Sequence, residues 1–76
     1  PSLLATGRTL RILDLDPSEP AFLAIRGLDG ALRFGSALPA GASTRTVETG
    51  LPRGTYIVTV DRRSQPLLSS RMLLAP

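Results

Sequence analysis

Three carboxylates and a hydroxyl lie within six consecutive residues, in the segment Asp14-Leu15-Asp16-Pro17-Ser18-Glu19. Ca²⁺ prefers oxygen ligands of this kind, so the segment is a candidate calcium loop. Pro17 stiffens it, however, and the glycine that gives an EF-hand loop its sharp turn is missing. Two of the carboxylates could also act as a glycosidase pair, but a chain of 76 residues leaves little room for a substrate cleft. We therefore interpret the segment as a solvated loop and predict no metal site.

The residue types that perform most enzyme chemistry are absent. The sequence has no Cys, no His and no Lys, so its Ser and Thr hydroxyls have no imidazole or amine to activate them. Without Cys there is also no thiolate chemistry and no disulfide framework. Gly35 and Gly41 are isolated, so no glycine-rich phosphate loop is formed. We predict that the chain is not an enzyme, has no catalytic residues and binds no cofactor.

Arginine provides every positive side chain, and the formal net charge is +3. The arginines are spread along the chain, and only Arg62 and Arg63 are adjacent. A nucleic-acid surface would cluster them and place aromatic residues between them. We interpret the arginines as parts of solvated strand faces and a turn, and predict no nucleic-acid partner. No apolar run approaches the roughly 20 residues that cross a bilayer, so we also predict no membrane insertion.

The elements that position the acidic segment and the arginines are expected to be short strands. Seven Gly and seven Pro divide the chain into segments of about eight residues, whereas isolated helices need about 12 or more. Strands at such spacing are typical of a small antiparallel sandwich or barrel that spans residues 1–76 as a single domain. The expected strands are Ser2–Ala5, Arg8–Leu13, Ala21–Arg26, Ala31–Phe34, Ser43–Thr49, Thr55–Val60 and Leu67–Leu74.

Alternation of apolar and polar residues predicts which side chains share a face. Ala21–Arg26 is nearly all apolar and is expected to be a central strand, whereas the polar, β-branched Ser43–Thr49 is expected to be an exposed or edge strand. Asp29-Gly30 predicts a hairpin turn, and Gly35 to Ala42 is expected to be a loop. The groups predicted to share a face are Leu10 with Ile12; Leu32 with Phe34; Tyr56 with Val58 and Val60; Thr55 with Ile57 and Thr59; and Leu68 with Met72 and Leu74.

A tight turn is expected immediately before the clearest strand. Pro52 presets φ for a turn, and Gly54 can adopt a positive φ. Tyr56 would then begin the strand with its ring inward and its hydroxyl bonded to a nearby backbone group, as in a tyrosine corner. We interpret Gly54 and Tyr56 mainly as residues that maintain the fold, with direct recognition by a partner as the alternative.

Three segments occur in the order and spacing of one known family. An apolar strand runs into a turn over Leu23–Leu32, an L-P-x-G-x-Y-x-V-x-V pattern occupies Leu51–Val60, and a basic residue precedes apolar ones in Ser70–Leu74. The stretch Ala21–Leu74 thus resembles the C-terminal sorting domain of type IX secretion cargo, an Ig-like β-sandwich found at the end of many secreted bacterial proteins. The P-N-P-like motif that usually opens this family has at most a remnant here, in Pro1-Ser2.

The resemblance implies an all-β, antiparallel Ig-like β-sandwich of six to seven short strands with a non-catalytic sorting function. Its partners would be the secretion machinery of the outer membrane and a cargo domain linked upstream. The protein would pass through the periplasm and become secreted or attached to the cell surface. The residues implied in recognition by that machinery are Gly54, Tyr56, Arg71, Met72, Leu73 and Leu74.

An accessory module is the alternative interpretation. Other Ig-like and fibronectin-like domains also use G-x-Y-x-V strands, and such a domain would act as a spacer or weak carbohydrate binder of a secreted or surface enzyme. A carbohydrate-binding face would require exposed aromatic residues, and the chain contains only Phe22, Phe34 and Tyr56. Because the sequence begins at Pro1 without Met, we expect it to be a piece of a longer protein.

Overall fold

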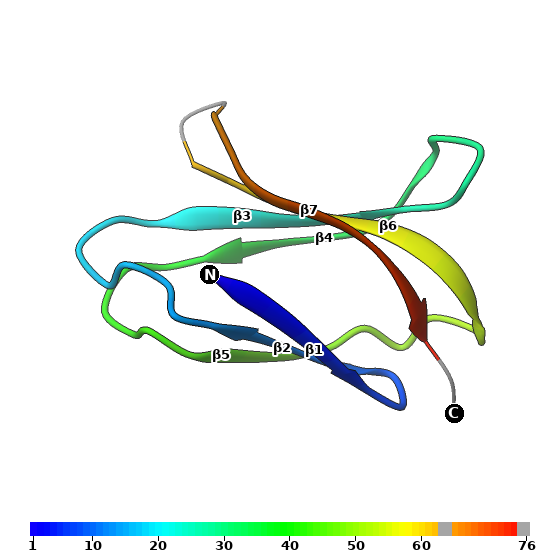
Figure 1. Cartoon of the computed structure of the whole chain (residues 1–76), viewed down its shortest axis with the longest axis horizontal. Helices are drawn as coiled ribbons and strands as arrows, with labels where there is room; N and C mark the ends of the chain where they lie inside the picture. Colours follow the sequence, from blue (N-terminus) through cyan, green and yellow to red (C-terminus); the bar gives the residue numbers. More distant parts are fainter. Residues whose placement is uncertain (63–64, 75–76) are drawn as a thin grey trace.

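Two antiparallel sheets face each other in the computed structural model, which describes residues 1–62 and 65–74 (Figure 1). One sheet has the strand order β1-β2-β5 and the other β4-β3-β6-β7. The predicted all-β, antiparallel sandwich is therefore confirmed. No helix among the described residues is long and apolar enough to cross a membrane. The strands are β1 (Ser2–Thr6), β2 (Thr9–Leu13), β3 (Ala21–Arg26), β4 (Leu32–Leu38), β5 (Arg45–Glu48), β6 (Gly54–Arg62) and β7 (Gln65–Leu74).

The order of the strands is that of an Ig-like sandwich. The first, second and fifth strands share one sheet, and the fourth joins the third, sixth and seventh in the other. In variable-type Ig domains the strand called C′ joins strands C, F and G in the same way. β3 is central and β5 lies at an edge, as predicted. In Figure 1, β6 and β7 curve toward the lower sheet, so that the end of β7 lies beside β1.

Alternating side chains from both sheets form the core. Full burial of a leucine, isoleucine or valine side chain stabilises the fold by about 1.5–3 kcal/mol. The predicted inward faces of β2 and β6 are confirmed, because Leu10 with Ile12, and Tyr56 with Val58 and Val60, are all buried. The remaining large buried side chains are Leu15, Leu23, Ile25, Leu38 and Leu74.

The prediction of a loop from Gly35 to Ala42 is wrong for its first four residues, because β4 continues to Leu38. Gly35 pairs with Ala24 of β3. A Cβ atom at Gly35 would lie 3.1 Å from Cζ of Phe22, so the Phe22 ring occupies the space that the glycine leaves. The glycine therefore accommodates a neighbouring ring inside a strand and does not end the strand.

A β-bulge overturns the prediction that Leu32 and Phe34 share a face. Leu32 pairs with Arg26, but the next pair along the two strands joins Phe34 to Ile25, which leaves Arg33 as the extra residue. Leu32 therefore points away from the core and is 58% exposed, whereas Phe34 packs against the core.

The segment before β6 also differs from the expected turn. Gly50 has a φ of +65°, whereas Gly54 is not among the residues with positive φ and already pairs with Leu74 in the sheet. The left-handed conformation thus falls four residues earlier than predicted. At the other end, β6 continues through Arg62 and β7 begins at Gln65, so both strands extend past the expected ranges Thr55–Val60 and Leu67–Leu74. Positions 63 and 64 between them lie outside the described residues.

Arg62 holds the acidic 14–20 segment against the sheet. Its guanidinium donates hydrogen bonds to the carbonyl oxygens of Asp16 (3.2 Å), Glu19 (3.4 Å) and Pro20 (3.3 Å). Its Nε atom also lies 3.3 Å from Oε2 of Glu19, and the side chain is only 14% exposed. The interpretation of the arginines as solvated is therefore wrong for Arg62, because folding brings this loop over the end of β6.

Within the same loop, Asp16 forms a local turn. Its carboxylate accepts hydrogen bonds from the backbone N–H of Ser18 (2.9 Å) and from the Ser18 hydroxyl (2.7 Å). These bonds, led by the backbone N–H, lower the pKa of Asp16 from its ordinary value. Within residues 1–62 and 65–74, no three or more His, Cys, Asp or Glu side chains gather as a metal site would require.

Candidate functional site

The start of β6 and the end of β7 bring together all six residues implied in recognition. In this register Gly54 pairs with Leu74, and Tyr56 pairs with Met72. Arg71 and Leu73 belong to the same stretch of β7 and pair with Ile57 and Thr55. We call the group Gly54, Tyr56, Arg71, Met72, Leu73 and Leu74 the chain-end site.

Successive residues of the chain-end site point to opposite faces of the sheet. Leu74 is fully buried and Met72 packs against the core, so these two stabilise the fold. Arg71 is exposed, and Leu73 is 60% exposed. In the folded chain, Arg71 and Leu73 are therefore the β7 residues of this site whose side chains a partner can contact.

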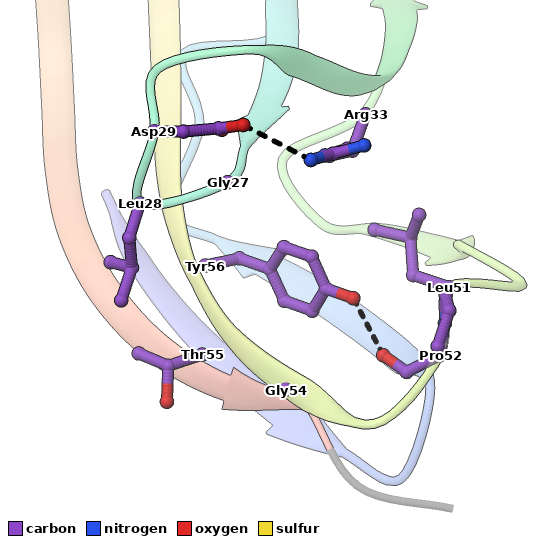
Figure 2. Close-up of a pocket in the computed structure, with 9 residues that line it drawn as sticks. All are labelled: Gly27, Leu28, Asp29, Arg33, Leu51, Pro52, Gly54, Thr55 and Tyr56. Carbon is purple, nitrogen blue, oxygen red and sulfur yellow. Dashed lines mark hydrogen bonds and ion pairs between the residues drawn. The ribbon is translucent and has the colours of Figure 1, made fainter.

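Tyr56 forms the predicted tyrosine corner. Its ring is buried, and its hydroxyl donates a 2.7 Å hydrogen bond to the carbonyl oxygen of Pro52 (Figure 2). The residue lies near the start of the sixth strand, just after the connection from the fifth, which is the position of the tyrosine corner in Ig-like sandwiches. A buried phenol needs a hydrogen-bond partner, and the turn before β6 provides it.

Thr49 is a supporting residue that the sequence did not reveal. Its side chain is buried, and its hydroxyl donates to the carbonyl oxygen of Arg8 (2.9 Å) and accepts from the N–H of Leu51 (3.2 Å). Its own N–H also donates to the Arg8 oxygen. Thr49 thus ties the tyrosine corner to the turn between β1 and β2, a contact between residues 41 positions apart.

The variant Tyr56→Phe is expected to lower the free energy of unfolding by about 0.5–1.5 kcal/mol, because it removes one hydrogen bond and keeps the buried ring. Urea denaturation of the chain measures the difference. Thr55→Val is the matched control: it removes a neighbouring hydroxyl, which has no hydrogen-bond partner among residues 1–62 and 65–74, and should stay within about 0.5 kcal/mol of the parent. Equal unfolding midpoints for Tyr56→Phe and the parent would show that the bond contributes nothing.

A pocket of about 570 Å³ adjoins the chain-end site (Figure 2). Its volume is in the range of small-molecule sites. It lies between the turn after β3 and the segment that leads into β6, and it includes Gly54 and Tyr56 of the chain-end site. A Cβ atom at Gly54 would contact the Tyr56 ring at 3.5 Å, so glycine leaves this part of the ring uncovered. The lining residues are Gly27, Leu28, Asp29, Arg33, Leu51, Pro52, Gly54, Thr55 and Tyr56.

An ion pair crosses the rim of this pocket. Nη2 of Arg33 lies 3.2 Å from Oδ2 of Asp29, and both side chains are more than half exposed, so the pair stabilises the fold by at most about 1 kcal/mol. Gly27 gives it space, because a Cβ atom there would lie 2.8 Å from Oδ1 of Asp29. The sequence did not reveal this pocket, because its lining comes from two turns that only the pairing of β3 with β6 brings together.

Comparisons of the chain with protein-family models, with curated proteins and with solved structures find no match. Its class rests on its own geometry: an Ig-like β-sandwich with a tyrosine corner at the start of the sixth strand.

Proposed function

We propose that this chain is a non-catalytic sorting domain that directs a larger cargo protein across the outer membrane by the type IX pathway. The proposal combines the resemblance of Ala21–Leu74 to that family with one observation, the open outer edge of β7. The cargo would be linked upstream, and the secretion machinery of the outer membrane would be the partner. The exported protein would be secreted or held at the cell surface.

β7 is the longest edge strand among the described residues. It has ten residues and pairs only with β6, whereas the other edge strands, β1, β4 and β5, have four to seven residues. β1 lies beside β7 but belongs to the other sheet, so it does not pair with the free N–H and C=O groups of β7. An open edge of this kind accepts an added strand from a partner. Arg71 and Leu73 would give such pairing its side-chain specificity.

A reporter fused upstream of this chain is expected to leave a host that has the type IX pathway. Export should fall at least about tenfold in Arg71→Glu and Leu73→Glu, if each change costs about 1.4 kcal/mol of binding to the machinery. Leu4→Glu is the matched control, because Leu4 is an exposed leucine on the other sheet and should not affect export. The measurement is reporter in the medium against reporter in the periplasm. Retention of the unaltered fusion, or equal export of all three variants, would refute the proposal.

An accessory function is the second candidate, and the pocket beside Tyr56 favours it. Its lining combines the Tyr56 ring and Leu51 with the polar Arg33–Asp29 rim, a mixture that could hold a small polar ligand such as a sugar. Glycan binding by the chain, together with periplasmic retention of the reporter fusion, would favour this function over sorting.

A further inference from the structure

Exposed apolar side chains gather on one face of the molecule. We call the side chains of the four-stranded sheet that point away from the core the outer sheet face; it includes Phe22, Arg26, Leu32, Ile57, Arg71 and Leu73. Five large hydrophobic side chains are exposed among the described residues, and four of them, Phe22, Leu28, Leu32 and Leu73, lie on or beside this face. These four are between 45 and 60% exposed. Single exposed leucines are ordinary, but a cluster on one face indicates an interaction surface.

Leu28 extends this face past the end of β3. Figure 2 shows its side chain beside that of Thr55, on the opposite side of β6 from the Tyr56 ring. Thr55 in turn pairs with Leu73 of β7. Leu28 and Leu73 therefore flank Thr55 at the chain-end edge of the outer sheet face.

Two arginines flank Ile57 in the centre of this face. The pairing places Arg26, Ile57 and Arg71 in one row across β3, β6 and β7. Two strand spacings separate the arginine Cα atoms by about 9–10 Å, so both side chains can reach a group lying over Ile57. Neither arginine side chain forms a hydrogen bond or ion pair within the part of the chain that the structure describes. Arg33, Arg45 and Arg62, in contrast, all bind oxygen atoms of the chain.

The carboxylate on the outer sheet face lies away from this row. Asp61 is four residues farther along β6 than Ile57, which is about 13 Å in an extended strand. The row of Arg26, Ile57 and Arg71 is therefore locally cationic, with an apolar residue at its centre and apolar residues around it. A complementary ligand must combine negative charge with apolar groups.

The composition of this face favours a protein over a sugar or a nucleic acid. Sugars and single-stranded nucleic acids are held largely by aromatic platforms on which rings or bases stack. A nucleic-acid duplex is held by a larger cluster of basic side chains than this row offers. Phe22 is the aromatic residue of the outer sheet face, and its ring lies against Gly35. Leucine and arginine side chains suit an extended peptide segment, since arginine binds carboxylates with two parallel hydrogen bonds.

We propose that the outer sheet face binds an acidic, apolar segment of a partner protein. A carboxylate of that segment lies over Ile57 between Arg26 and Arg71, and its apolar side chains pack on Leu28, Leu32 and Leu73. The inference goes beyond the proposed function, because it concerns the face of the sheet and holds whether or not the domain directs export.

The test is an NMR titration of the isotope-labelled chain with the peptide acetyl-Leu-Glu-Leu-Glu-Leu-amide. We expect amide shifts that centre on Arg26, Ile57, Arg71 and Leu73, and binding that weakens as salt is added. The glutamine counterpart of the peptide should bind at least about tenfold more weakly, and polygalacturonate should not shift these amides. Absence of shifts on this face, equal binding of the glutamine peptide, or shifts of the same amides by polygalacturonate would overturn the proposal.

Two double variants then assign the binding to the arginines. Arg26→Gln/Arg71→Gln should raise the dissociation constant for the glutamate peptide at least about tenfold. Arg8→Gln/Arg11→Gln removes the same charge from the region of the other sheet and should leave the constant unchanged. Neither pair has a side-chain partner among the described residues, so both variants should fold, which circular dichroism checks. Equal effects of the two double variants would show non-specific attraction to net charge and would refute the proposed site.

Discussion

Leu74→Ala is expected to lower the free energy of unfolding by about 2–5 kcal/mol, because it leaves a cavity in place of a fully buried side chain. A 76-residue domain has a total stability of about 4–11 kcal/mol, so this one change removes a large part of it. The matched control is the adjacent leucine. Leu73→Ala truncates a side chain that is 60% exposed and should stay within about 0.5 kcal/mol of the parent.

Urea denaturation of the two variants separates the two roles within the chain-end site. If Leu74→Ala unfolds at a much lower urea concentration and Leu73→Ala does not, the buried residue maintains the fold and the exposed one is free for recognition. Loss of export in a Leu74 variant would then be attributed to unfolding, whereas loss in a folded Leu73 variant would indicate a lost contact. Equal destabilisation by both changes would contradict the inward and outward assignment of these residues.

Arg62→Ala is expected to lower the free energy of unfolding by about 2–3 kcal/mol. The change removes hydrogen bonds from a charged, largely buried donor to three carbonyl oxygens of the 14–20 segment. The ion pair with Glu19 adds little, because Glu19 is more than one-third exposed and solvent screens the interaction. Most of the effect should therefore come from the loop, whose Leu15 is part of the core.

Two further variants test the cause of this effect. Arg62→Lys keeps the charge but loses the planar fork that reaches several oxygens, so it should recover only part of the stability. Arg11→Ala removes an exposed arginine for which no side-chain bond is found among the described residues, and should change stability by less than about 0.5 kcal/mol. Urea denaturation measures all three. A fully stable Arg62→Lys would show that charge alone is sufficient. Equal stability of Arg62→Ala and Arg11→Ala would contradict the proposal that Arg62 holds the 14–20 segment against the sheet.

The features that were predictable from the sequence depend on near neighbours in the chain. Alternation with a period of two identified the buried faces of β2 and β6, because successive side chains of any extended strand point to opposite sides. The tyrosine corner was predictable for a similar reason, since Tyr56 bonds to a carbonyl only four residues away. These observations established the all-β class, the central β3 and the edge position of β5.

Tertiary structure decided the features that join distant parts of the chain. The Phe22 ring packs against Gly35 within β4, the extra residue Arg33 turns Leu32 outward, and Arg62 binds a loop more than 40 positions away. None of these appears in a local pattern, because each depends on which strands pair and in which register.

The candidate surfaces divide in the same way. Composition and turn chemistry were enough to predict short strands around an apolar interior, whereas the six residues of the chain-end site were proposed from the resemblance of Ala21–Leu74 to the sorting-domain family. Only the pairing of β6 with β7 revealed that Leu74 is buried while Leu73 is exposed. Only the pairing of three strands placed Arg26 and Arg71 on either side of Ile57. A strand's own sequence determines which of its side chains share a face, whereas its neighbours in the sheet determine which residues those side chains contact.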